Sequence, residues 1–270
     1  MDQGLSQATK AGSVHGAGIL LYMTRCIGDR TEVEFVLGQE DFALGWSQGG
    51  CWSAFEGGRK GDEAPERTAA REFVEETAGA LSINGCRTIA EIEALLRRRE
   101  FALCITVDRS NADQEPRLYV YYIVRIPWGT PTKAYFDMVH RPLSALHQLC
   151  DSERVAREKR CAIGGTELVD AHQKRVRAVH RAYAELPYFL RTHAAVRVCT
   201  AHSVDKAHIS VVPDYLEKRE VRTFPMHAID SMLRNREMRS MPRGVRFRYC
   251  FIPVIKAAMR QLSDVIDGCH

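Results

Sequence analysis

The segment between residues 57 and 79 limits what this chain can fold into more than any other part. The stretch from Pro65 to Thr77 predicts a helix, because proline suits the first turn and Gly79 follows just past the end. Glycines before this helix let the backbone turn tightly and approach a ligand closely. They stand in the sequence Gly57-Gly58-Arg59-Lys60-Gly61. The segment therefore predicts a glycine-rich loop that leads into a helix.

Three carboxylates share one face of the predicted helix. Glu72, Glu75 and Glu76 are spaced at i, i+3 and i+4, which places their side chains next to one another. Such neighbours repel, at a cost of roughly 0.2–0.5 kcal/mol per pair. A divalent cation would relieve the repulsion, and carboxylate oxygens are ligands that Mg²⁺ and Mn²⁺ accept. A solvated acidic helix face is the alternative interpretation.

The whole segment resembles the Nudix box, the signature of the Nudix hydrolase superfamily. The box reads Gly, five residues, Glu, seven residues, then Arg-Glu-apolar-x-Glu-Glu-x-Gly-apolar. Two positions depart from it, because Ala78 stands in place of Gly and Gly79 in place of an apolar residue. Both lie at the end of the predicted helix, where a glycine with left-handed backbone conformation is common. A shift of this glycine by one residue, to position 79, is compatible with the box. The matching residues are Gly57, Glu63, Arg71, Glu72, Phe73, Glu75 and Glu76.

Resemblance to Nudix hydrolases implies both a fold and an activity. The fold is α+β, a mixed β-sheet sandwiched between helices, with the box forming loop, helix and loop. The activity is Mg²⁺- or Mn²⁺-dependent hydrolysis of a nucleoside diphosphate linked to another group. Glu63 and Arg71 would pair and, with Gly57, hold the loop against the helix, while the carbonyl of Glu56 would add a metal ligand. The carboxylates implied as metal ligands are Glu72, Glu75 and Glu76, the last two also being candidate catalytic residues.

A general base is expected from outside the box. The stretch from Tyr215 to Pro225 resembles the late Nudix strand that reads Glu-apolar-x-aromatic-x-Pro. The resemblance implies that Glu220 or Glu217 reaches the metal site as the base or as an extra ligand. An ordinary edge strand with alternating charges is the alternative interpretation.

Three regions are expected along the chain. Residues 1–14 would be a flexible lead, residues 15–128 and 207–270 the Nudix domain, and residues 129–206 a mostly helical, basic insertion.

Hydrophobic patterns predict the remaining elements. A second helix should begin at Thr88, which has capping-box spacing to Glu91. Two further helices are expected at Met226–Arg236 and Ile252–Ile266. Strands are expected at Ala17–Met23, Val33–Leu37, Cys51–Phe55, Phe101–Val107, Leu118–Ile126, His208–Val212, Val221–Phe224 and Val245–Phe251.

Positive charge is concentrated outside the box. Lys and Arg outnumber Asp and Glu by 13 to 8 in residues 129–206 and by 8 to 4 in residues 226–270, although the whole chain carries only +4. That split suits an acidic, cation-binding centre flanked by surfaces for a polyanion such as RNA. A row of four cations on one predicted helix could follow RNA phosphates, with a solvated amphipathic helix as the alternative. The four are Lys174, Arg175, Arg177 and Arg181.

Motif style narrows the resemblance further. The opening Trp52–Gly58, the form of the box and the strand Leu216–Val221 are similar to the Nudix proteins of large DNA viruses, several of which remove the cap from messenger RNA. Trp46, Trp52 and Trp128 are candidates for stacking on a base, with core packing as the alternative for each.

The resulting hypothesis is a metal-dependent hydrolase that releases methylated guanosine diphosphate from capped RNA and leaves a 5′-monophosphate. Hydrolysis of free nucleotides, dinucleoside polyphosphates or diphosphoinositol polyphosphates is one alternative. A Nudix-fold module that binds RNA without hydrolysing it is another, and the oligomeric state is left open.

Composition bears on the compartment. No apolar run approaches the ~18 residues that a membrane span needs, and no signal peptide is visible at the N-terminus. Nine single cysteines without a CxxC pair favour a reducing compartment, so a cytoplasmic protein is expected, in the host cytoplasm if it is viral.

Overall fold

The computed structural model describes residues 14–28, 30–42, 48–110, 116–163, 166–191, 194–199, 208–234 and 245–267. The predicted lead, except for Val14, lies outside these residues. Within them, no helix is both long enough and apolar enough to cross a membrane.

A mixed β-sheet forms the centre of the molecule. Its middle strand, β1 (Val14–Ile27), pairs antiparallel with β2 (Arg30–Glu40) and with β4 (Phe55–Gly58). On its other side β1 runs parallel to β6 (Leu118–Arg125), and β5 (Leu103–Asp108) pairs antiparallel with β6. The strands predicted at Phe101–Val107 and Leu118–Ile126 are therefore confirmed as β5 and β6.

Among the described residues, three further strands extend the sheet beyond β2. The strand β9 (Lys218–Pro225) pairs with one edge of β2, and β3 (Cys51–Ser53) pairs with its end. The last strand, β10 (Arg246–Phe247), runs parallel to β3. The single strand predicted at Cys51–Phe55 is thus two strands, because the chain passes from β2 at Ser53 to β1 at Phe55.

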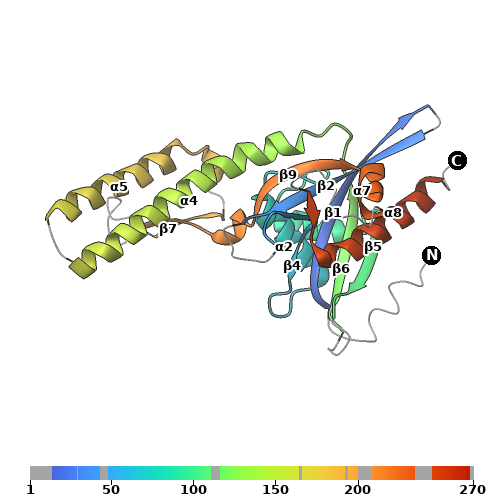
Figure 1. Cartoon of the computed structure of the whole chain (residues 1–270), viewed down its shortest axis with the longest axis horizontal. Coiled ribbons are helices and arrows are strands. Elements are labelled where there is room, and N and C mark those ends of the chain that lie inside the picture. The colour runs from blue at the N-terminus through green and yellow to red at the C-terminus, as the bar shows by residue number, and fades with distance from the viewer. Residues whose placement is uncertain are drawn as a thin grey trace.

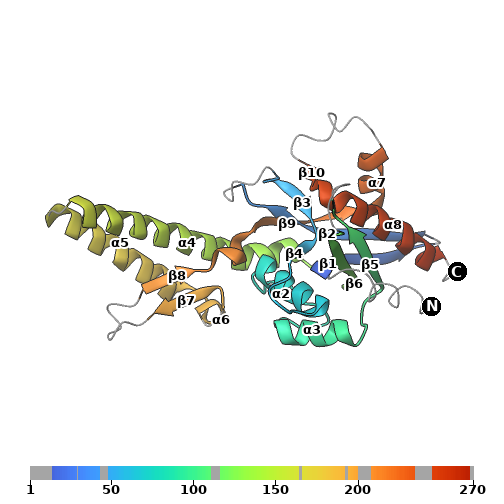
Figure 2. The same ribbon diagram turned by 90° about the horizontal axis from the view of Figure 1, so that it is seen from below.

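Helices cover both faces of the sheet. On one face lie α2 (Pro65–Thr77) and α3 (Ile89–Arg97), and on the other lie α7 (Met226–Arg234) and α8 (Ile252–Asp267), as Figure 2 shows. Alternate residues of β1 serve the two layers, since Ile19 and Leu21 join one buried cluster while Leu20 and Tyr22 join the other. The predicted α+β class, with a mixed sheet between helices, is confirmed.

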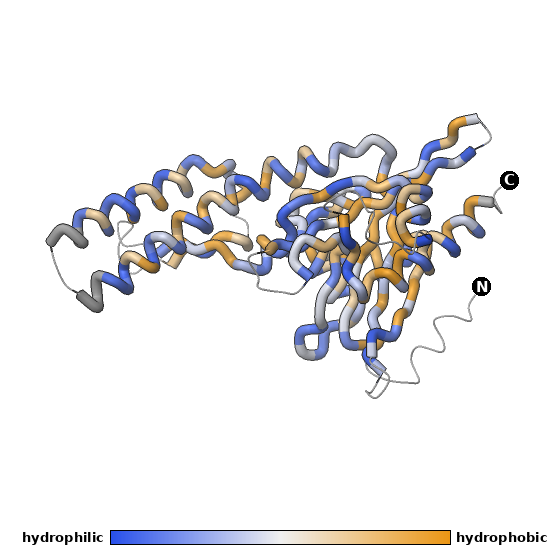
Figure 3. Tube along the Cα trace, viewed as in Figure 1, coloured by the Kyte–Doolittle hydropathy of each residue, from blue (hydrophilic) through white to orange (hydrophobic). Residues whose placement is uncertain are grey.

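A helical hairpin projects from this domain. It consists of α4 (Thr132–Ile163) and α5 (Thr166–Glu185), which lie side by side and extend away from the sheet in Figures 1 and 2. Hydrophilic and hydrophobic residues alternate along both helices (Figure 3). Its apolar contacts join the cluster that covers α2, through the buried residues Leu143, Leu146, Val179 and Leu186.

A small second sheet lies beside the hairpin. After α6 (Tyr188–Arg191), β7 (Val196–Cys199) pairs antiparallel with β8 (His208–Val211). The strand predicted at His208–Val212 therefore pairs away from the main sheet. A 3₁₀ turn, η2 (Pro213–Leu216), then leads into β9.

Two element ends differ from their sequence predictions. The strand expected at Val245–Phe251 contains only β10, and the chain continues into a 3₁₀ turn, η3 (Tyr249–Phe251). At the end of α2 the left-handed cap is Ala78, with φ 49°, and Gly79 also has a positive φ of 64°. The helix therefore ends where the box has its glycine, with alanine in that conformation.

The capping box at the start of α3 yields a stability prediction. The Thr88 side chain accepts a hydrogen bond from the Glu91 amide, and the Glu91 carboxylate accepts one from the Thr88 amide. Thr88→Ala should lower the free energy of unfolding by about 1 kcal/mol in urea denaturation. Thr88→Ser, which keeps the hydroxyl, is the matched control, and equal losses in both variants would contradict a capping role.

Candidate active site

A cavity of about 380 Å³ opens beside the N-terminal loop of α2. Its walls come from β4 with the loop after it, the helix α2, the residue after β5, the start of β6, the turn η2 with the residue after it, and the segment after β10. The lining residues are Glu56, Gly57, Gly58, Lys60, Arg71, Glu72, Glu75, Arg109, Tyr119, Asp214, Glu217 and Arg248.

Arg71 joins the loop to the helix. Its Nε donates to both carboxylate oxygens of Glu63 at 3.0 and 3.2 Å, and one terminal nitrogen donates to the carbonyl of Gly58 at 2.7 Å. The other terminal nitrogen donates to Glu72 at 2.6 Å and Glu75 at 2.9 Å. Burial lowers the pKa of Arg71, but these acceptors outweigh it and the pKa is raised overall. The structure therefore brings together Glu63 and Arg71, the pair that the box implies.

Gly57 leaves the space that the Glu72 carboxylate occupies. A Cβ atom at position 57 would lie 2.2 Å from Cδ of Glu72 and 2.4 Å from its farther oxygen. Real Cβ atoms do not approach carboxylates this closely, so any side chain at Gly57 would displace Glu72 from the cavity wall.

Three carboxylates of the cavity influence one another. Burial raises the pKa of Glu72 to about 7, and the negative charges of Glu75 and Glu217 add to that rise. Burial also raises the pKa of Glu217, to which Asp214 and Glu75 contribute. Of the two candidate bases, the structure brings Glu217 into the cavity with the box carboxylates.

Glu220 lies elsewhere. It pairs with Gln39 across β9 and β2, while its neighbour Val221 joins the buried cluster beneath α2. Successive residues of a strand point to opposite faces, so Glu220 points away from that layer. Its carboxylate accepts a hydrogen bond from Arg222 at 2.6 Å and lies 3.9 Å from Nζ of Lys133. The expectation that Glu220 reaches the metal site is not met in this structure.

Glu76 is placed behind the cavity wall. It is 1% exposed, and one carboxylate oxygen accepts a hydrogen bond from the amide of Glu56 at 2.8 Å. The other oxygen lies 3.0 Å from Nζ of Lys218. Burial raises the pKa of Glu76 against the opposing effect of Lys218. Its predicted role as ligand and catalytic residue stays a prediction.

Lys218 was not anticipated from the sequence. Its ammonium is fully buried, donates to Glu40 at 2.6 Å and to the hydroxyl of Ser53 at 2.9 Å, and also faces Glu76. Gly38 makes room for it, since a Cβ there would lie 2.9 Å from Cδ of Lys218. In the sequence, Lys218 appears only as a lysine in a predicted strand region. Its burial depends on the register that sets it opposite Glu40 on β2, and one sequence does not show that register.

Arginines from outside the box also line the cavity. Arg109, which follows β5, donates to the buried Glu56 carboxylate at 2.6 Å. Arg248, which follows β10, lies 3.1 Å from Glu40 and 3.4 Å from Glu56. Neither residue belongs to a recognisable motif, and only the fold brings them to the acidic end of the box.

The three candidates for base stacking lie in different surroundings. Trp52 is 1% exposed and packs edge-on against Phe224 with ring centroids 4.9 Å apart, so stacking of a base on Trp52 is wrong. Its strand position faces the α8 layer, where an indole fills core volume. Trp128 is half-buried with the guanidinium of Arg25 4.5 Å above its ring, and Trp46 lies outside the described residues.

The predicted basic row lies on the helical hairpin. Its four cations, Lys174, Arg175, Arg177 and Arg181, are exposed on α5 and do not line the cavity. Among the described residues none of them forms an ion pair, whereas Lys133, Arg141 and Arg154 on α4 are each paired with an acidic side chain of the same helix.

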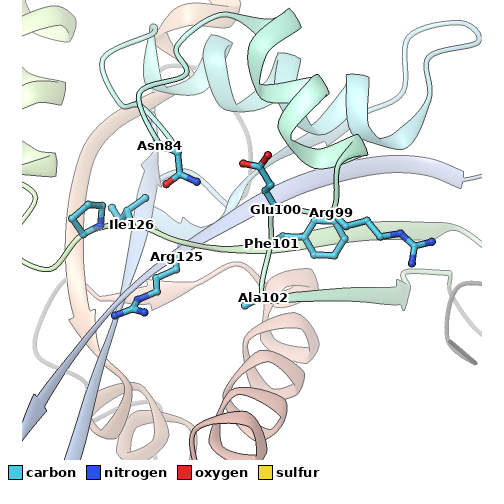
Figure 4. A pocket seen from close by; sticks show the side chains of 8 residues that line it. Asn84, Arg99, Glu100, Phe101, Ala102, Arg125 and Ile126 are labelled. Carbon is cyan, nitrogen blue, oxygen red and sulfur yellow. The ribbon is translucent and has the colours of Figure 1, made fainter. Parts of the chain in front are cut away.

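A second hollow, of about 590 Å³, lies at the far end of α3. Figure 4 shows Phe101 at its wall and the guanidinium groups of Arg99 and Arg125 directed apart from each other. Glu100 accepts a hydrogen bond from Arg98 at 2.6 Å. Because its charged groups do not converge, we assign no chemistry to this hollow.

The chain is similar to parts of two solved protein structures. No protein-family model and no curated protein matches the chain. Among solved structures it is similar to RenU, a Nudix hydrolase from M. smegmatis, with 21% identity over 42% of this chain and a TM-score of 0.27. It is also similar to a mutT/nudix family protein from Listeria innocua, with 17% identity over 43% of this chain and a TM-score of 0.27. The matches cover 60% and 68% of those chains, so this chain spans less than two thirds of RenU.

The oxygen donors of the cavity suit a hard divalent cation. Glu72, Glu75 and Glu217 are carboxylates, the ligands that Mg²⁺ and Mn²⁺ prefer. Burial, together with the charges of Glu75 and Glu217, raises the pKa of Glu72. The described residues contain no ready-made group of three or more His, Cys, Asp or Glu arranged to hold a metal. Arg71 donates hydrogen bonds to both Glu72 and Glu75. The carboxylate donors fit a divalent cation, and Arg71 would compete with that cation for Glu72 and Glu75.

The raised pKa of Glu72 predicts how the stability of the metal-free protein depends on pH. The folded-state pKa of about 7 exceeds the ordinary value of 4.5, so folding favours the protonated carboxyl. This contribution is fully present below about pH 4.5 and is lost as the pH rises through 7, at a cost on the order of 1–3 kcal/mol. Thermal denaturation in metal-free buffer between pH 4.5 and pH 8 measures the loss.

Glu72→Gln removes the titrating group and should make the melting temperature depend less on pH. Glu158→Gln, at an exposed carboxylate on α4, is the matched control and should keep the dependence of the unmodified protein. The same pH dependence in all three proteins would contradict the assignment to Glu72.

Proposed function

We propose that the protein is a metal-dependent hydrolase of the Nudix type that cleaves a diphosphate bond. The observation that carries this proposal is that Glu72, Glu75 and Glu217 line one cavity. Two of these carboxylates belong to the box, whose loop and helix are joined by Arg71. Carboxylates crowded in this way, with cationic side chains beside them, suit a substrate that brings phosphates and a divalent cation together.

Glu72 and Glu75 are the side chains that would hold Mg²⁺ or Mn²⁺, with the backbone carbonyl of Glu56 as a further ligand. The ion would neutralise the diphosphate and lower the pKa of a bound water. Glu217 is our candidate for the base that takes the proton from the attacking water on a carboxylate oxygen, because it lines the same cavity. Lys60 lies 3.6 Å from Glu75 and 3.2 Å from Asp214, and it would bind substrate phosphate at the mouth.

Glu76 supports this arrangement from behind. Its hydrogen bond from the Glu56 amide fixes the end of β4, and the buried ammonium of Lys218 balances its charge. The box position implies that Glu76 is a ligand as well, and that role remains part of the proposal.

Capped RNA is the substrate that we propose. The support is the row of cations on α5, which form no ion pair within the described residues. An RNA strand that extends beyond the cavity would bind more tightly if its phosphates also contacted this basic surface. The cap supplies the diphosphate bond, and the products would be methylated guanosine diphosphate and RNA with a 5′-monophosphate.

Substitution of the cavity carboxylates tests the activity. Glu75→Gln and Glu217→Gln should each lower the rate of nucleotide release from cap-labelled RNA by at least about 100-fold, because each removes a charge that holds the metal or moves a proton. Glu220→Gln, on the neighbouring strand β9, is the control and should retain activity. The assay uses Mg²⁺ and Mn²⁺, with product identity read by mass and folding checked by circular dichroism.

The same assay should include free nucleotides and dinucleoside polyphosphates. Turnover of these but not of capped RNA would contradict the proposed substrate and keep the proposed reaction. No metal-dependent turnover of any diphosphate would contradict the reaction itself.

The α5 surface has its own test. Simultaneous replacement of Lys174, Arg175, Arg177 and Arg181 by Gln should weaken RNA binding and reduce the dependence of log Kd on log salt, by up to about 0.7 for each phosphate that is no longer neutralised. Replacement of the paired α4 cations Lys133, Arg141 and Arg154 is the control for a general change in charge. If the dependence of log Kd on log salt is unaltered in the α5 variant, α5 does not bind RNA phosphates.

A further inference from the structure

A buried carboxylate at the inner wall of the cavity is surrounded by hydrogen-bond donors and cations. The Glu56 side chain is 1% exposed. One oxygen accepts hydrogen bonds from Arg109 at 2.6 Å and from the hydroxyl of Tyr121. The other oxygen lies 3.4 Å from Arg248. A buried charge is tolerated only when it is paired in this way, so Glu56 fixes both guanidinium groups beside it.

The sheet is built to admit this side chain. Glu56 on β4 pairs with Gly18 on β1, and a Cβ at position 18 would lie 2.6 Å from Cβ of Glu56. The absence of a side chain at Gly18 therefore gives Glu56 its space. Tyr121 enters from β6, which pairs with the other edge of β1 opposite the same glycine.

The two arginines are also supported from other sides. The guanidinium of Arg109 lies 4.2 Å from the ring centroid of Tyr119 and 5.3 Å from that of Tyr121, distances typical of cation–π contacts. Arg248 is tied to Glu40 at 3.1 Å, and its amide donates to the carbonyl of Trp52. Each guanidinium carries five donor hydrogens, more than Glu56 can accept.

Charge is divided along the cavity wall. Glu72, Glu75 and Glu217 stand with Arg71 at the box, whereas Arg109 and Arg248 stand at the buried Glu56. A divalent cation would bind at the first group, where Arg71 is already committed to carboxylates and is a poor partner for a phosphate. Guanidinium groups match phosphate oxygens in geometry and charge.

We propose that Glu56 is a positioning residue that holds Arg109 and Arg248 as a two-arginine binding site for the phosphate chain of the substrate. The inference rests on the proposed function for the identity of the substrate, a chain of linked phosphates. It assigns the side chain of Glu56 to the arginines, which is separate from any role of its backbone carbonyl toward a metal.

Inorganic tripolyphosphate tests the site without turnover. Calorimetric titration of the full-length protein in metal-free buffer at low salt should show binding. Arg109→Gln and Arg248→Gln should each weaken it at least about 10-fold, because each removes a charge-assisted hydrogen bond. Arg141→Gln, on exposed α4, changes the net charge equally and should bind within about twofold of the unmodified protein.

Glu56→Gln separates positioning from plain electrostatics. Loss of a negative charge beside an anion site should strengthen tripolyphosphate binding if charge alone matters. Loss of the group that orders two arginines should weaken it, and we expect a loss of at least about fivefold, or roughly 1 kcal/mol. Asp214→Asn removes a cavity charge without touching either arginine, and it should bind at least as tightly as the unmodified protein.

The outcomes decide the proposal independently of the activity. Unchanged binding in Arg109→Gln and Arg248→Gln, tighter binding in Glu56→Gln, or no binding by the unmodified protein would overturn it. If Glu56→Gln fails to fold, the two arginine variants still test the site. Tripolyphosphate binding that depends on the arginines, in a protein that hydrolyses no diphosphate, would keep this site and refute the proposed function.

Discussion

The guanidinium of Arg71 is the group on which the site depends. It binds the loop carbonyl of Gly58, the loop carboxylate of Glu63 and the helix carboxylates Glu72 and Glu75 at the same time. Without it, the loop would lose its attachment to α2, and two largely buried carboxylates would lose their nearest cation. An arginine suits this task better than a lysine, because its planar fork supplies several fixed donors while a lysine offers one point charge.

A second ionic group lies directly beneath the first. Lys218 is shared by Glu40 and Glu76, and all three side chains are buried. Buried ion pairs seldom add much net stability, since desolvation offsets most of their attraction. Their effect here is on register, because Lys218 and Glu40 pair across β9 and β2. A slip of β9 by one residue would take the ammonium away from two carboxylates in the core. The strand that follows Glu217 is thereby held in one position.

Local patterns were sufficient to predict most elements and the box. Pro65 in the first turn and Gly79 past the end mark α2, apolar patterns mark the paired strands β5 and β6, and the spacing of Thr88 and Glu91 marks the start of α3. These signals depend on neighbours in sequence, which one chain displays directly. The α+β class follows from their order.

Signals that depend on strand pairing could not be predicted in this way. Trp52 is a core residue because β3 pairs with the end of β2 and faces α8, whereas its sequence context says only that an aromatic precedes the box. Glu217 and Glu220 are separated because the first ends the turn η2 and the second lies within β9. Arg109 and Arg248 are far apart in sequence and meet at Glu56 only through the sheet.

Three glycines of the sheet and loop have one property in common. Gly18, Gly38 and Gly57 each stand where a methyl group would collide with a charged side chain, namely Glu56, Lys218 and Glu72 in turn. The charged side chains therefore occupy space that is open only because these positions are glycine. At Gly38 and Gly57 the nearest atoms belong to the side chains of Lys218 and Glu72, so a larger residue there becomes acceptable only when that charged partner has already been replaced. At Gly18 a Cβ would also lie 2.7 Å from the backbone carbonyl oxygen of Phe55, so glycine is required there whatever residue occupies position 56.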